Sequence, residues 1–158
     1  MRNDEDSTEA AGSYWSRLTS TACFPDFGII VAMTVRANGD SRALEWPEVR
    51  IARHMLEYGS SEAQEFLPQS EVARASHWRC PCGCTSFNFV IEGMPLGEKG
   101  FYPLDQFLFS DDLNLSGIFV WERDGVLGGV EVFTITAEVS KRLPSPESLR
   151  LAVASIKR

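Results

Sequence analysis

The chain has 158 residues, a formal net charge of −7 and a hydrophobic content of 44%. A chain of this length suits one domain that needs neither disulfides nor a metal to hold its core. Its acidity argues against nucleic acid, because phosphate binding depends on Lys and Arg, and no apolar run approaches the roughly 20 residues of a membrane span. We therefore expect neither a nucleic-acid partner nor a membrane partner.

The N-terminal part is acidic and polar, unlike a signal peptide or a transit peptide. We expect a disordered acidic tail over 1–12 and a single α+β domain over 13–158. The β-branched stretch 28–37 ends at a turn and predicts a buried strand. Without export, the expected location is the cytoplasm, where cysteines are thiols or metal ligands instead of structural disulfides.

Helical spacing of apolar residues follows over 47–58, with a proline in the first turn and a glycine directly after the last. This pattern predicts a helix. A second short helix is expected over 61–67, ending at Pro68, and a further turn is expected within 70–76.

The second half of the chain carries strand patterns. Residues 85–92 alternate apolar and polar side chains, which predicts a strand. The Gly, Pro and Asp residues of 93–115 predict an irregular loop with some strand. Near the end, the stretch that opens with Ser145-Pro146-Glu147 predicts a helix with an apolar face reaching Ile156.

Between these stretches lies the strongest local signal, two apolar runs at 116–122 and 126–136 around Asp124-Gly125. An Asp-Gly pair in this position predicts a tight hairpin, and the Gly128-Gly129 pair predicts a bulge in its second strand. The fold class we predict is α+β: a mainly antiparallel sheet with two to four short helices.

Three cysteines, Cys80, Cys82 and Cys84, lie close to His77 and form the densest candidate site. Thiolate and imidazole are the usual zinc ligands, and these residues supply the required four. The spacing argues against zinc, because an extended C-x-C-x-C segment separates its outer residues by about 13 Å, although Pro81 and Gly83 could fold it more tightly. We expect buried thiols without a cofactor, and zinc is the alternative. A redox role has less support, because no helix begins after the cysteines.

Catalytic patterns are few. His54 lies within the predicted helix, and its pairing with a cysteine of the 80–84 segment stays open because such partners meet in space. Asp111-Asp112 suits a solvated turn, and Glu131 suits an outward strand position. The chain has no phosphate loop, dinucleotide fingerprint or H-E-x-x-H motif. We therefore expect a protein that is not an enzyme, and an unrecognised enzyme remains a further alternative.

Several residues of the hairpin and the preceding loop are candidates for partner binding. An aromatic side chain on the solvated face of a hairpin could anchor a partner, and carboxylates favour a basic one. The candidate partner-binding residues are Trp121, Phe133, Asp111 and Asp112.

The chain resembles a family of short, uncharacterised bacterial proteins over roughly 48–150. The resemblance rests on the segment 80–84 leading into a strand, on Asp124-Gly125-Val126-Leu127, on Glu131, and on the proline-flanked stretch 143–149. It implies the fold outline and carries no activity.

Together these features favour a small acidic cytoplasmic protein that binds another protein. The form we favour is an immunity protein that neutralises a toxin with a basic domain, because carboxylates and aromatic anchors suffice for that role. The alternative is a small zinc- or thiol-containing protein.

Overall fold

The hairpin predicted around Asp124-Gly125 forms the centre of the sheet. A computed structural model describes residues 41–111, 114–135 and 140–152, in which β5 (Asn114–Arg123) pairs with β6 (Val126–Thr134). Asp124 and Gly125 adopt φ values of 51° and 77°, the positive values that a two-residue hairpin turn needs. Trp121 pairs with Gly129 and Glu122 with Leu127. Gly128 is therefore the extra residue of a bulge, and both the turn and the bulge are confirmed.

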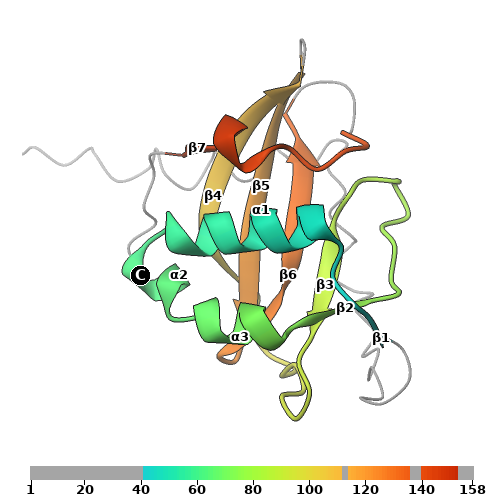
Figure 1. Cartoon of the computed structure of the whole chain (residues 1–158), viewed down its shortest axis with the longest axis vertical. Coiled ribbons are helices and arrows are strands. Elements are labelled where there is room, and N and C mark those ends of the chain that lie inside the picture. Colours follow the sequence, from blue (N-terminus) through green and yellow to red (C-terminus); the bar gives the residue numbers. More distant parts are fainter. Residues whose placement is uncertain (1–40, 112–113, 136–139, 153–158) are drawn as a thin grey trace, which may run out of the picture.

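Around this hairpin the described residues build one antiparallel sheet of seven strands in the order β1-β2-β3-β6-β5-β4-β7 (Figure 1). The predicted strand at 85–92 is confirmed as β3. The remaining strands are β1 (Ser41–Arg42), β2 (Arg74–Ser76), β3 (Phe87–Val90), β4 (Tyr102–Asp111) and β7 (Arg150–Leu151).

β4 is the main difference from the prediction, which placed an irregular loop over 93–115. Ten residues of this stretch form a strand that pairs with β5 from Tyr102 to Asp111. Its register shifts between Pro103 and Asp105. A proline has no N–H to donate to a neighbouring strand. It is therefore tolerated at such an irregularity, where the ladder of hydrogen bonds is interrupted. The apolar alternation of Phe107 and Phe109 outweighs the turn-forming residues before it.

The first predicted helix is confirmed as α1 (Trp46–Glu57). Its start is fixed by Glu48, whose carboxylate accepts a hydrogen bond from the backbone N–H of Glu45 at 2.7 Å. Ser60 caps the N-terminus of α2 (Ser61–Gln64), because its side chain accepts a hydrogen bond from the backbone N–H of Ala63. The expected stop at Pro68 is wrong, because this proline lies in the first turn of α3 (Leu67–Val72), where its missing N–H costs no bond.

The predicted C-terminal helix is also wrong over the described residues. Only η2 (Pro146–Ser148) is helical, and β7 then joins the edge of the sheet beside β4. The expected tail at 1–12, the strand at 28–37 and the end of the predicted helix lie outside the described residues.

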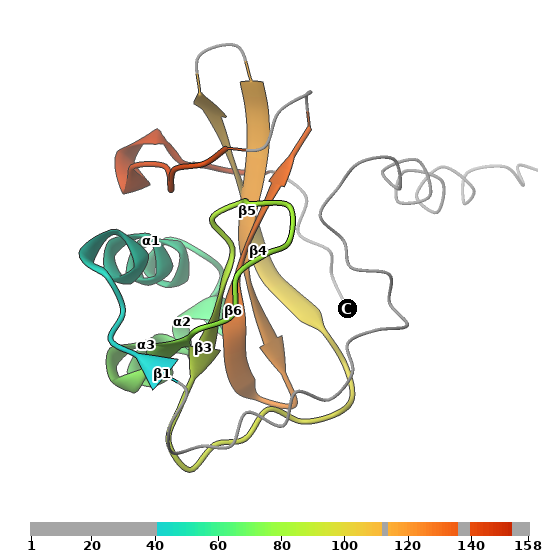
Figure 2. The same cartoon turned by 90° about the vertical axis from the view of Figure 1, so that its right-hand side faces the viewer.

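Two faces of the sheet differ in what covers them. Figure 2 shows α1, α2 and α3 together on one side of the strands. The core lies between these layers, and the α+β class is confirmed. Alternation along β5 directs Phe119 and Trp121 to the other face, outside this core.

No helix of the described residues is long and apolar enough to cross a membrane. The core comprises Ile51, Ala52, Met55, Leu56, Ala63, Phe66, Phe87, Phe89, Ile91, Phe107, Phe109, Ile118, Val120, Leu127, Val130, Val132 and Leu149.

Candidate cysteine site

The cysteine segment precedes β3 and forms a turn. The backbone N–H of Gly83 donates to the carbonyl of Cys80 at 2.9 Å, and Gly83 adopts a φ of 79°. A residue with a side chain is strained at that φ, so the glycine makes the turn accessible. The chain between the two outer cysteines therefore reverses, in contrast to the extended segment considered from the spacing.

As a result, the ligand atoms of Cys80, Cys82 and Cys84 all lie within 4.8 Å of one another. The sulfurs of Cys80 and Cys82 are 3.1 Å apart, and the backbone N–H of Cys84 points to the Cys82 sulfur at 3.4 Å. The wide separation of an extended segment is therefore wrong for this chain. Three sulfurs at these distances could hold a metal ion.

The three cysteines differ in exposure and chemical state. Cys80 and Cys84 are free thiols with exposures of 9% and 8%, which confirms the predicted burial. Cys82 is exposed and disulfide-bonded. The expectation of a buried thiol is therefore wrong for Cys82. The cluster combines two protected thiols with one sulfur that solvent reaches.

Ser86 connects the cluster to the sheet. The Cys84 thiol donates to Ser86 Oγ at 3.1 Å, and the same oxygen accepts from the backbone N–H of Val132 at 2.9 Å. The hydroxyl also forms a hydrogen bond with the carboxyl group of Glu131. Because Val132 and Glu131 belong to β6, the central sheet fixes the orientation of Cys84.

The electrostatics of this region favour neutral groups. Burial raises the pKa of Glu131 to about 7, although its hydrogen bond with Ser86 acts in the opposite direction. Burial also raises the pKa of Cys80 to about 11, with a contribution from Cys84 and from the charge of Glu131. Cys80 is therefore a protonated thiol at pH 7, which is unlike an activated nucleophile. A bound cation would offset the negative charges that Cys80 and Glu131 carry when they ionise.

Other predicted site residues lie apart from this cluster. His77 is exposed and does not belong to the group of ligand atoms. Trp121 is 7% exposed and Phe133 is half-buried, packed against Phe119. Asp112 and the side chain of Asp111 lie outside the described residues.

Sequence reasoning did not identify Ser86 and Glu131 as a pair. Alternation places each on the face away from the core, but only the register, in which Phe87 opposes Val130, brings them together. His54 lies on α1, where its ring stacks on Tyr58 with centroids 4.5 Å apart. This histidine is not in the group of ligand atoms around the cysteines.

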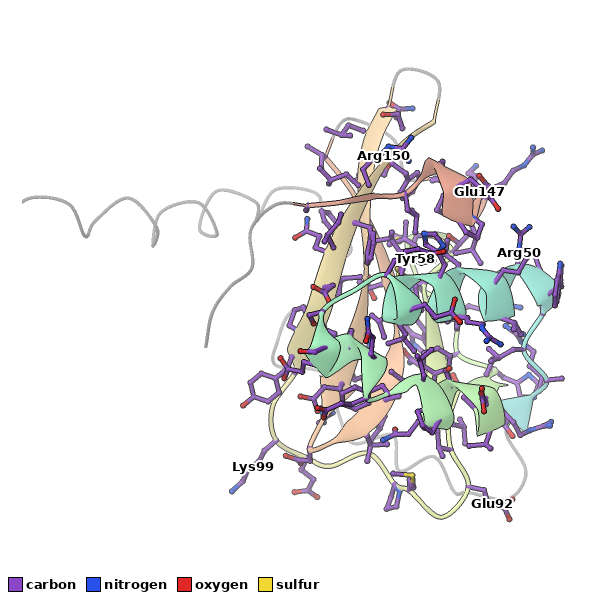
Figure 3. The ribbon with its side chains drawn as sticks, turned by 60° about the vertical axis from the view of Figure 1, so that its left-hand side comes forward. Arg50, Tyr58, Glu92, Lys99, Glu147 and Arg150 are labelled. Atoms are coloured by element: carbon purple, nitrogen blue, oxygen red, sulfur yellow. The ribbon has the colours of Figure 1, made fainter. Side chains whose placement is uncertain are left out.

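A second feature lies on the helices. The stretch 57–71 contains no Lys or Arg, and all of its carboxylates are exposed. Tyr58, labelled in Figure 3 near the end of α1, is 66% exposed, and Val72 is 65% exposed. We call this feature the acidic helical surface; its carboxylates are those of Glu57, Glu62, Glu65 and Glu71.

Charges interact at this surface within α1 and between α1 and α3. Arg53 Nε lies 2.7 Å from Glu57 Oε1. This hydrogen bond, together with the charges of Glu57 and Glu71, raises the pKa of Arg53. In the first half of α1, Arg50 forms an ion pair of 2.5 Å with Glu147 of η2 (Figure 3).

Comparison with protein-family models finds no match, and comparisons with curated proteins and with solved structures find none either. The resemblance to short bacterial proteins therefore stays a prediction. The functional argument depends on the site itself.

Proposed function

We propose that this protein, in its reduced form, holds a zinc ion on Cys80, Cys82 and Cys84. The observation that carries the proposal is the approach of the three ligand atoms to within 4.8 Å of one another. In a tetrahedral zinc site with Zn–S bonds of about 2.3 Å, neighbouring sulfurs are separated by about 3.8 Å. The cluster therefore needs only small shifts of its side chains to reach that geometry.

The surroundings of the sulfurs support this proposal. Burial keeps the Cys80 thiol neutral at pH 7, with a pKa of about 11, so that a thiolate forms there when a cation compensates the charge. The backbone N–H of Cys84 and the hydroxyl of Ser86 already contact sulfurs of the cluster. Such outer contacts orient metal ligands. Among the described residues three ligands come together, which leaves the fourth zinc position for water or another group.

Elemental analysis of protein purified with a dithiol reductant tests this function. We expect about one zinc per chain, and loss of the metal in Cys80→Ser and Cys84→Ser. Thr85→Ser changes the same segment without removing a sulfur, so this matched control should keep its zinc. Reduced, folded wild-type protein without zinc after dialysis against zinc-containing buffer would contradict the proposal.

A second candidate function is protein binding through the acidic helical surface. The observation that favours it is the exposure of Tyr58 and Val72 beside carboxylates in a stretch without Lys or Arg. Exposed aromatic anchors surrounded by charge are typical of binding surfaces, and carboxylates steer a basic partner. The buried Trp121 is less suited to this role than Tyr58. An immunity protein that neutralises a basic toxin domain is the form we favour.

Capture of a partner with the tagged protein, followed by binding kinetics at two salt concentrations, tests this second function. Glu65→Lys with Glu71→Lys should slow association and reduce its salt dependence, whereas Tyr58→Ala should speed dissociation. Glu92→Lys with Glu98→Lys makes the same charge change on exposed residues of another segment and is the matched control. Equal effects of the two charge reversals would contradict binding at this surface.

A further inference from the structure

A cavity of about 220 Å³ lies between the end of β4 and the segment 140–148. Phe109 and Ser110 of β4 line one side, and residues leading into η2 line the other. Figure 1 shows η2 and the last residues of β4 at the same end of the molecule. Pockets for drug-sized ligands measure about 300–1,000 Å³, so this cavity suits a smaller molecule. None of its lining residues belongs to the cysteine cluster or to the acidic helical surface.

The charge beside the cavity is opposite to that of the whole chain. The protein has a net charge of −7, but the stretch 140–152 contains three basic residues and one carboxylate. That carboxylate, Glu147, already pairs with Arg50 (Figure 3). Arg142 lines the cavity and is exposed, and within the described residues its guanidinium forms no ion pair and no hydrogen bond. Because a guanidinium fits the oxygens of a phosphate or a carboxylate, this side of the cavity favours an anionic group.

Serine hydroxyls supply most of the remaining polar lining. Ser140 Oγ donates to the carbonyl of Arg142 at 2.8 Å, and Ser148 Oγ donates to the carbonyl of Ser145 at 2.7 Å. A hydroxyl has one proton to donate, but its oxygen can still accept a hydrogen bond. Ser140 and Ser148 therefore offer acceptors to a ligand. The hydroxyl of Ser110 makes no hydrogen bond within the described part of the chain, so its proton is available to an anion.

The rest of the lining is apolar and comes from Phe109, Leu143 and Pro144. Phe109 is buried, whereas the two residues of the segment are half-buried. A carbon skeleton can contact these side chains. The cavity therefore combines donors for an anion, acceptors for hydroxyl groups and an apolar surface. An inorganic anion would use only the first of these three.

We propose that this cavity binds a small phosphate ester that carries hydroxyl groups. Its phosphate contacts Arg142 and Ser110, and its hydroxyls donate to the oxygens of Ser140 and Ser148. A carboxylate has two oxygens, both of which a bidentate guanidinium uses, whereas a phosphate ester has a third for the hydroxyl of Ser110. This inference is independent of the zinc site and of the acidic helical surface.

Isothermal titration calorimetry with glycerol 3-phosphate, propyl phosphate and inorganic phosphate tests the inference. The two esters share a three-carbon skeleton, but propyl phosphate lacks both hydroxyls. A neutral hydrogen bond contributes roughly fivefold in affinity, so glycerol 3-phosphate should bind about 25-fold more tightly than propyl phosphate. Inorganic phosphate should bind most weakly. Equal affinities of the two esters, or no binding of glycerol 3-phosphate at millimolar concentration, would overturn the proposal.

A variant of the arginine tests the anion contact. Arg142→Met should weaken binding of both esters by about tenfold or more, because hydrogen bonds to charged groups are the stronger ones. Lys141→Met makes the same charge change on an exposed neighbour that does not line the cavity, and it is the matched control. Its loss should stay below about threefold. Equal losses in the two variants would show attraction by net charge alone and would overturn the site.

A serine variant tests the hydroxyl contact. Ser148→Ala should reduce the advantage of glycerol 3-phosphate over propyl phosphate by about fivefold. Ser70→Ala is the matched control, because Ser70 Oγ makes the same kind of local bond, to the carbonyl of Leu67, away from the cavity. An unchanged advantage in Ser148→Ala would overturn the assigned acceptor. Circular dichroism of every variant shows whether the fold is retained.

Discussion

Glu48 and Glu131 are two shielded carboxyl groups with opposite electrostatics. Glu48 is 5% exposed and forms a two-pronged ion pair with Arg42, at 2.6 and 2.7 Å. Burial acts to raise its pKa, but the hydrogen bonds from Arg42 and Glu45 lower the pKa below its ordinary value. Glu131 is partly buried beside the cysteine cluster, and burial raises its pKa to about 7. Within the described residues, none of the ion pairs involves Glu131.

This difference separates a structural carboxylate from a candidate functional one. The Glu48 carboxylate accepts a hydrogen bond from the backbone N–H at the start of α1, and its negative charge is compensated by Arg42 of β1. Glu131 lies with Ser86 and the thiols in a region of acidic groups that a cation would stabilise. Beside Glu131, a proton or a metal ion can supply the positive charge, whereas Arg42 already supplies it to Glu48.

The two groups also predict opposite responses of stability to pH. Because the folded pKa of Glu48 is lowered, its contribution is present above its unfolded pKa and is lost as pH falls. The folded pKa of Glu131 is raised to about 7, so the folded state holds its proton more tightly than the unfolded state. Its contribution is therefore present at low pH and is lost as pH rises through about 7.

The largest expected effect comes from breaking the compensated pair. Arg42→Met leaves the Glu48 carboxylate buried without its cation, and we expect a loss of about 4 kcal/mol in the free energy of unfolding at pH 7. Arg50→Met removes the exposed pair with Glu147 and is the matched control, with an expected loss below about 1 kcal/mol. Urea denaturation measures both. Similar losses in the two variants would contradict the larger contribution to stability that we assign to the buried pair of Arg42 and Glu48.

Removal of the Glu131 charge should have the opposite sign. Glu131→Gln should stabilise the protein by up to about 3 kcal/mol at pH 8, since the raised pKa represents a cost of that order when the group ionises. At pH 4.5 the variant and the wild type should be nearly equal. Melting temperatures at pH 4.5 and 8 measure this, with the exposed Glu92→Gln as control. A destabilised variant at pH 8 would mean that the ionised carboxylate is already compensated.

A smaller effect is expected from Ser86→Ala. This change leaves the buried N–H of Val132 without its acceptor, at a cost of about 2 kcal/mol. It also removes the hydrogen bond that lowers the pKa of Glu131, so the pKa of this carboxyl should rise further. NMR titration of the Glu131 carboxyl carbon measures the direction. A fall in this pKa would contradict the assigned role of Ser86.

Local patterns predicted the elements whose signal lies in adjacent residues. The hairpin follows from the positive φ that Asp124 and Gly125 tolerate, and α1 follows from its apolar spacing and early proline. β4 was missed because Pro103 and Asp105 interrupt its pattern, and long-range pairing with β5 compensates for that interruption. The C-terminal helix failed for the same reason, since β7 gains a partner in β4.

The candidate site was only half predictable. The three cysteines are visible in the sequence, but their approach depends on a turn that an extended-chain estimate ignores. The roles of Ser86 and Glu131 depend on how β3 pairs with β6, which no local pattern specifies. The sequence offers His77 as a fourth ligand because imidazole binds zinc and the residue lies near the cysteines, but the structure does not bring it into the group.

The most direct test of the account is X-ray absorption at the zinc edge of the reduced, zinc-loaded protein. We predict three sulfur neighbours at about 2.3 Å from the metal, completed by one lighter atom, and one sulfur fewer in Cys84→Ser. A metal surrounded by nitrogen and oxygen alone would contradict the assignment of the zinc site to Cys80, Cys82 and Cys84.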